Sequence, residues 1–131
     1  MTQSDATRIL ITDAVKAAFN SATIKIYTGA MPANPQAAAT GTLLATITMP
    51  STAFGASNST GTATANAISA VTAANSGTAG YARATKSDGT TVIMDLTVGT
   101  TGGPEDFLIN SLAIASGASV SVTSFTLSSP A

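Results

Sequence analysis

The start of the chain carries apolar side chains at the spacing of one helical face. Ser4 and Asp5 suit the first turn of a helix, because their side-chain oxygens accept hydrogen bonds from free backbone N–H groups. Asn20 and Ser21 suit its end. The pattern predicts an amphipathic α-helix over residues 4–20, with a buried face made of four residues: Ile11, Val15, Ala18 and Phe19.

Two charged residues belong to the opposite side of this helix. Asp13 and Lys16 lie three residues apart, so we expect them to form an ion pair facing solvent. Two placements of the helix stay open: it packs on the sheet of its own domain, or it is an arm that docks on a neighbouring subunit. We therefore divide the chain into residues 1–21, an N-terminal helix or arm, and residues 22–131, a β-domain.

After the helix, apolar residues recur with the period of two that is typical of β-strands. The dipeptide Asp88-Gly89 separates two alternating runs, which is the strongest local signal for a β-hairpin. Between Val122 and Phe125 the alternation slips, and this slip predicts a bulge. The predicted strands are 23–27, 42–49, short strands within 61–71, then 81–86, 91–98, 107–115 and 119–127.

This pattern amounts to one helix and seven or eight short strands, with turn residues about every ten positions. Strands do not alternate with further helices, so a doubly wound α/β fold is not expected. The sequence predicts an all-β fold, namely a single antiparallel β-sandwich or jelly-roll-like domain that begins with a short α-helix.

Composition removes most catalytic chemistry. Ala, Thr, Ser and Gly supply 75 of the 131 residues, and only 8% of the chain is charged. The chain lacks His, the commonest general base and metal ligand, and it lacks Cys, the source of thiolate nucleophiles and zinc-thiolate sites. We therefore expect no enzyme activity, no catalytic residues, no bound metal and no cofactor.

The few charges also speak against two kinds of partner. The five Lys and Arg residues are scattered, whereas nucleic acids and membrane surfaces attract clustered cations. The chain contains neither a secretory signal pattern near its start nor a run of about 18 apolar residues. We expect a soluble protein that is made in a cytoplasm and binds neither nucleic acid nor membrane.

Three acidic positions could carry chemistry, and each has a simpler interpretation. The pair Glu105-Asp106 could form a carboxylate dyad or bind calcium, but calcium needs more oxygen ligands, so a solvated start of a strand is favoured. Asp88 fits the hairpin turn. Asp95 lies inside a predicted strand, where we expect a structural ion pair rather than a catalytic acid, with one of three cations: Lys25, Arg83 or Lys86.

Two polar stretches and two aromatic residues complete the candidates. A loop containing Gly99, Gly102 and Gly103 lacks the Lys and the following helix of a phosphate-binding loop. Alternating threonines resemble the arrays of ice-binding surfaces, although exposed strands take Thr by ordinary propensity; they are Thr60, Thr62 and Thr64. Tyr27 and Tyr81 could provide the aromatic platform of a glycan-binding module, and they fit strand positions equally well.

Three stretches of the sequence resemble a group of small proteins encoded among the structural genes of tailed bacteriophages. They are Ile24 to Phe54, Ala82 to Leu96 and Ile114 to Leu127. The group is similar to capsid cement or decoration proteins and other minor virion components. The resemblance implies a structural protein of the capsid surface, synthesised in the host cytoplasm, that binds the major capsid protein and assembles as a dimer or trimer. The group has no active-site motif, so no site residue is implied.

Two alternatives to a cement protein stay open. One is a virion component associated with the tail or a fibre, and the other is a glycan-binding or adhesin-like β-sandwich. The sequence does not locate the interface. The stretch 56–79, rich in Ala, Thr and Ser, is the first candidate for contacts with a neighbour.

Overall fold

The computed structural model describes residues 4–34, 37–56, 62–100, 102–103, 105 and 107–128, and it has the expected all-β architecture. Within these residues, no helix is long and apolar enough to cross a membrane. The described elements are α1 (Asp5–Ala18), β1 (Thr23–Thr28), β2 (Leu43–Thr48), β3 (Thr62–Thr64), β4 (Val71–Thr72), β5 (Gly77–Thr85), β6 (Val92–Thr100), β7 (Phe107–Ile109), β8 (Ala113–Ile114), β9 (Ser119–Val120) and β10 (Val122–Ser128).

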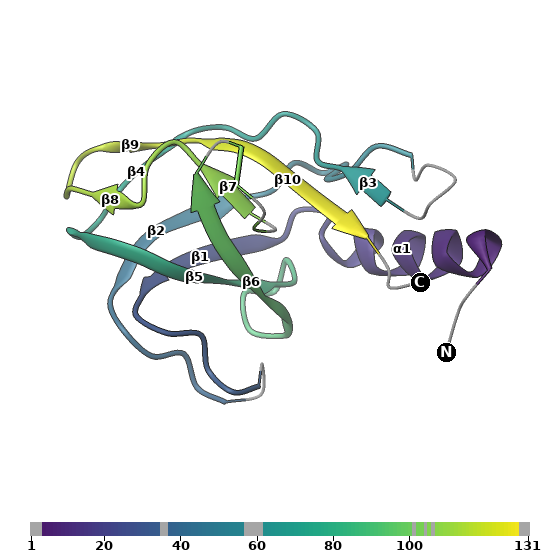
Figure 1. Ribbon diagram of the computed structural model, residues 1–131, viewed down its shortest axis with the longest axis horizontal. Helices are drawn as coiled ribbons and strands as arrows, with labels where there is room; N and C mark the ends of the chain where they lie inside the picture. The colour runs from purple at the N-terminus through teal and green to yellow at the C-terminus, as the bar shows by residue number, and fades with distance from the viewer. Residues whose placement is uncertain are drawn as a thin grey trace.

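One curled sheet forms most of the domain. Its strand order is β2-β1-β5-β6-β7-β10-β3, with β8 paired to β5, while β4 and β9 form a separate pair. Figure 1 shows β1, β2 and β5 in one layer and β7 and β10 in the other, with α1 at one end. The described strand pairs are antiparallel except β6 with β7, which run parallel. The predicted sandwich-like fold is therefore confirmed, and the parallel pair is a local exception to it.

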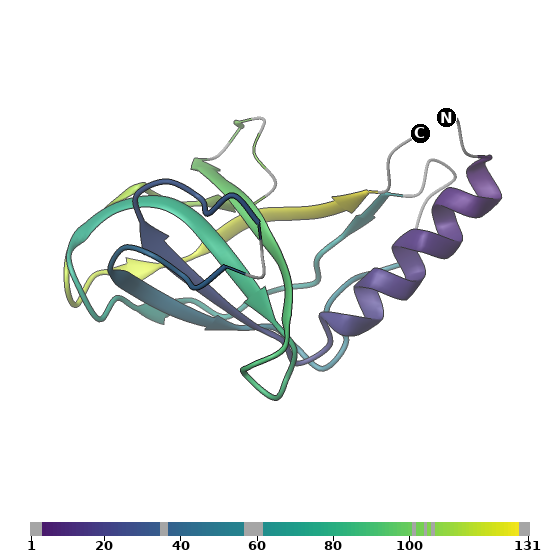
Figure 2. The same cartoon turned by 90° about the horizontal axis from the view of Figure 1, so that it is seen from below.

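α1 is shorter than the predicted helix over 4–20, and Val15 and Ala18 of its predicted buried face are half-buried. Just beyond the end of α1, Ser21 adopts a left-handed conformation with φ of 57°. Lys16 pairs with Asp13 at 3.1 Å, as expected, and also donates to the carbonyl of Gly55 at 3.0 Å. Phe19 is fully buried, and α1 contacts β3 and β10 of its own domain. Figure 2 shows the helix running obliquely beside the end of β10. The side chain of Ile11, assigned to the buried face, lies outside the described residues.

All four phenylalanines meet in the core. Phe125 of β10 lies at the centre, with ring centroids 5.5 Å from Phe19, 5.0 Å from Phe54 and 5.1 Å from Phe107. Each pair is edge-to-face, the arrangement that the aromatic quadrupole favours. The cluster therefore joins the end of α1, the segment before β3, β7 and β10 into one packed unit.

The predicted hairpin is present between β5 and β6. Lys86 and Thr91 close it with a backbone hydrogen bond of 2.9 Å, and Gly89 takes a φ of 78°. Asp88 accepts hydrogen bonds from the backbone N–H groups of Thr90 and Thr91 and from the Thr91 hydroxyl. These bonds, the one from the Thr91 hydroxyl foremost, lower the pKa of Asp88 to about 2. Asp88 is thus a turn residue, as predicted.

Two predicted strands are each broken in two, and Asn110 explains both breaks. The prediction of single strands over 107–115 and 119–127 is wrong: β7 and β8 replace the first, β9 and β10 the second. The Asn110 side chain accepts from the N–H of Ser121 and donates to the carbonyl of Ser119, so it interrupts the backbone ladder. The predicted bulge is confirmed, because the β7–β10 register shifts between Val122 and Ser124.

Candidate functional site

The central strand β5 is buried on both of its faces between residues 81 and 85. Ala82 and Ala84 belong to the hydrophobic core. Tyr81, Arg83 and Thr85 point to the opposite face of the sheet, yet they are only 0%, 6% and 5% exposed. This outer face is therefore covered by another segment of the chain. The polar side chains between the face and that segment form the candidate site.

An ion pair occupies the middle of this face. Arg83 and Asp95 are opposite one another on β5 and β6, and two N–H groups of Arg83 donate to the two carboxylate oxygens at 2.7 and 3.1 Å. Their side chains are 8% and 3% exposed. Of the three cations that the sequence offered, the structure pairs Asp95 with Arg83. The hydrogen bond to Asp95 raises the pKa of Arg83, so the guanidinium stays charged.

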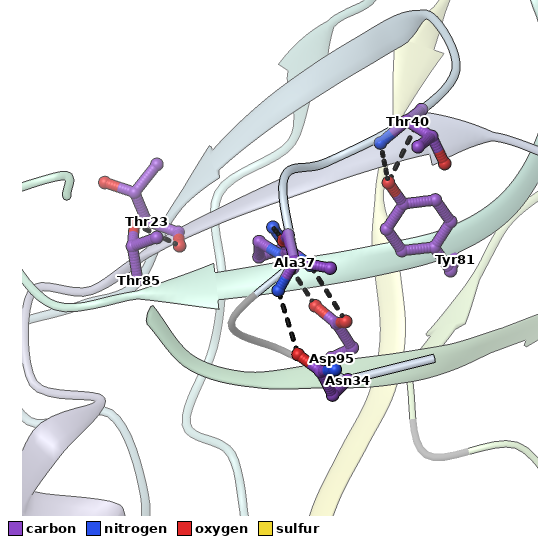
Figure 3. Close-up of polar contacts among 8 residues, drawn as sticks. Thr23, Asn34, Ala37, Thr40, Tyr81, Thr85 and Asp95 are labelled. Carbon is purple, nitrogen blue, oxygen red and sulfur yellow. Dashed lines mark hydrogen bonds and ion pairs between the residues drawn. The ribbon is translucent and has the colours of Figure 1, made fainter. Parts of the chain in front are cut away.

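Residues 30–34 and 37–40, here called the strap, lie over the ion pair. Arg83 uses its third donor on the carbonyl of Ala37 at 2.7 Å. The Tyr81 hydroxyl accepts from the N–H of Thr40 at 2.9 Å and donates to the Thr40 carbonyl at 2.8 Å. Figure 3 shows Thr40 above the Tyr81 hydroxyl and Ala37 above Asp95, with Asn34 beside Asp95. Tyr81 and Arg83, here called the latch, therefore fasten the strap to the sheet by hydrogen bonds.

The two tyrosines do not form an exposed platform. Their rings stack at 5.4 Å with an interplanar angle of 15°, and Tyr81 is fully buried. Burial, followed by the neighbouring Tyr81, raises the pKa of Tyr27. Tyr27 is half-buried, so only part of one ring is open to solvent. In this conformation Tyr81 cannot serve as the binding surface of a glycan module.

Glu105 departs from the expected solvated position. It is half-buried, and its Oε2 atom is buried with no hydrogen-bond partner among the described residues. The carboxyl group occupies the space that a Cβ would need at Gly99 or Gly103, so these glycines make room for it. Asp106, its predicted companion, lies outside the described residues. Within the described chain, no three acidic side chains come together in a metal-binding arrangement.

The threonine run and the small-residue stretch lie at the other side of the domain. Thr60 and residues 57–61 as a whole lie outside the described residues, while Thr62 is half-buried and Thr64 exposed on the short strand β3. Residues 66–76 follow the surface beside β10, and most of them are exposed. A hollow of about 130 Å³ opens where this segment leaves β10, lined mainly by residues 65–68 and 122–125.

The geometry therefore gathers the polar side chains into structural contacts. Arg83, Asp95 and Tyr81 satisfy one another and the strap, and Asp88 holds a turn. The sequence left Lys25, Arg83 and Lys86 open as partners of Asp95, and the structure pairs it with Arg83. The contacts to the strap join residues more than forty positions apart, so the local pattern did not indicate them. Comparison of the chain with protein-family models, with curated proteins and with solved structures returned no match.

Proposed function

We propose that this protein is a structural component of a tailed bacteriophage virion, a cement or decoration protein that binds the assembled capsid shell. Two arguments support the proposal. The first is the sequence resemblance of three stretches to small proteins of this kind. The second, which carries the proposal, is the character of the surface that the fold leaves exposed.

The exposed surface consists largely of short side chains. Along residues 66–76, the exposed positions are Asn66, Ala67, Ser69, Ala70, Thr72, Ala74, Asn75 and Ser76. Among the side chains that the structure describes, the exposed charged ones are Asp13, Lys86 and Asp88. Short side chains lose little rotamer entropy when a neighbour covers them, and a weakly charged surface has few ions to desolvate. Such a surface suits close packing in an assembly.

A cement protein works by linkage. It binds the assembled shell and not the free subunits, so its binding free energy adds to the stability of the shell. We propose the major capsid protein as its partner and a dimer or trimer on a symmetry axis as its form on the shell. A rigid sandwich with a packed aromatic core provides a fixed shape for this role.

The proposal is tested by mixing the purified protein with shells that lack it. We expect saturable binding to assembled shells, no binding to free capsid subunits, and a higher melting temperature of the decorated shell. A virion inventory by mass spectrometry that lacks the protein would refute the proposal. Density at the tail or a fibre in electron microscopy would instead favour a tail-associated component, and binding on a glycan array would favour an adhesin-like module.

The stretch 66–76 is the contact surface that we assign first. Ala70→Arg places a long charged side chain on this exposed segment, and Thr48→Arg places the same side chain on the exposed side of β2. We expect the first variant to bind shells at least about tenfold more weakly, since an unpaired buried charge costs more than 1.4 kcal/mol. The second should bind normally. Equal binding by both variants would contradict this assignment.

A further inference from the structure

The strap differs from the rest of the domain in how it is held. None of its described residues is buried: Pro32 and Ala37 are half-buried, and the others are exposed. By contrast, β1 beneath it contains Ile24 and Ile26, both fully buried. The described side chains of the strap therefore bury little apolar surface of their own, and the strap contributes mainly by covering Tyr81 and the ion pair.

Hydrogen bonds to two side chains supply the contacts that fasten the described part of the strap to the sheet. These are the two bonds between Tyr81 and Thr40 and the bond from Arg83 to Ala37. A neutral hydrogen bond contributes about 1 kcal/mol net and one from a charged group about 1.5–3 kcal/mol, because water replaces each of them when it breaks. These bonds are few, so opening the strap costs much less than unfolding the sandwich.

Both ends of the strap have a hinge. Gly29 and Gly41 flank it with φ values of 84° and 85°, in the left-handed region that glycine adopts without strain. Just outside the strap, Thr28 and Thr42 are tied together by a backbone hydrogen bond of 3.1 Å and by the bond from the Thr42 N–H to the Thr28 hydroxyl at 2.8 Å. The base of the strap is thus tied together, and a glycine in the left-handed region lies at each of its ends.

We propose that the strap opens about Gly29 and Gly41 as a separate unit while the sandwich stays folded. Opening breaks the Tyr81 and Arg83 latch and uncovers the stacked tyrosines and the ion pair on the outer face. This conformational device does not depend on the proposed virion role. It makes the outer face of β1, β5 and β6 a surface that is presented in the open state and hidden in the closed state.

Hydrogen exchange at the Thr40 amide distinguishes this opening from global unfolding. Among the described residues, the Thr40 N–H donates to Tyr81 alone, so it reports the latch, whereas amides in the β1–β5 ladder report the core. Phe125→Leu weakens the aromatic cluster, which is intact in both closed and open states. We expect core amides in this variant to exchange about tenfold faster and the Thr40 amide to keep its rate. Equal acceleration of both would overturn the proposal.

Limited proteolysis tests the latch itself. Elastase cleaves after small residues, and Ala37, Ala38 and Ala39 offer it sites within the strap. Tyr81→Phe keeps the ring and removes the hydroxyl, so we expect cleavage there to become about tenfold faster, as cleavage follows the open population. Tyr27→Phe is the matched control, because Tyr27 stacks on the same ring without bonding the strap, and it should leave the rate unchanged. An unchanged rate in Tyr81→Phe, or an equal increase in both variants, would overturn the proposal.

Discussion

The buried ion pair between β5 and β6 gives the sharpest stability prediction. Asp95→Ala leaves the Arg83 guanidinium beneath the strap with the Ala37 carbonyl as its remaining acceptor among the described residues, because both carboxylate contacts are lost. The side chains are 8% and 3% exposed, so water cannot fully replace the carboxylate. Removing one partner of a buried pair costs about 3–5 kcal/mol, since the other charge stays buried and uncompensated.

The assay is equilibrium unfolding in urea, with melting temperature as a second readout. For a domain of this length, a loss of about 3–5 kcal/mol lowers the melting temperature by roughly 10–20 °C. Arg83→Met should cost a similar amount, because it strands the Asp95 carboxylate. The double variant Arg83→Met with Asp95→Leu should lose much less unfolding free energy than Arg83→Met alone and Asp95→Leu alone lose together, since no charge is left buried.

An exposed ion pair in the same chain provides the control. Asp13 is 46% exposed in its pair with Lys16, so we expect Asp13→Ala to cost less than about 1 kcal/mol. If Asp95→Ala cost as little as Asp13→Ala, or if the Arg83 and Asp95 substitutions were additive, the pair would not be buried and coupled as described. Either result would contradict the assignment of Arg83 and Asp95 as a buried, coupled ion pair.

Three further predictions concern other parts of the fold. Gly80→Ala should lower the free energy of unfolding in urea by about 3 kcal/mol or more, because a Cβ at this position would overlap the Gly29 carbonyl oxygen. A Cβ at Gly29 would meet no atom, so Gly29→Ala should lower it by about 1–2 kcal/mol, the cost of a side chain at a positive φ. The low pKa of Asp88 stabilises the fold fully above about pH 4, and this contribution is lost as the pH falls through about 2; Asp88→Ala should remove that part of the pH dependence of unfolding. Phe125→Ala should cost at least about 3–5 kcal/mol, because it empties the centre of four rings, and a loss below about 2 kcal/mol would contradict the packing.

Local signals in the sequence predicted the features that neighbouring residues decide. Asp88 and Gly89 fix the hairpin through bonds within three residues, and Ser21, in the turn just after α1, takes a left-handed conformation. The choice of Arg83 as the partner of Asp95 follows from the β5–β6 register that this hairpin imposes. Here local chemistry and tertiary structure agree.

Features that depend on contacts between residues distant in the sequence could not be predicted from it. Asn110 looks like one polar residue in an apolar run, and only its bonds to Ser119 and Ser121 reveal why two strands break. The strap reads as a loop rich in Ala and Pro, and its place over β5 depends on Tyr81 and Arg83, 41 and 46 positions away from their partners. Likewise, the parallel pairing of β6 with β7 has no signature in the alternation of either strand.

We propose that this domain acts by binding an assembled capsid shell. Sedimentation of purified protein with shells and, separately, with free capsid subunits tests it most directly. We expect co-sedimentation with shells at a saturating ratio set by their symmetry and none with free subunits, together with a rise in the melting temperature of the shells. Failure to bind shells, or binding that leaves their melting temperature unchanged, would contradict it.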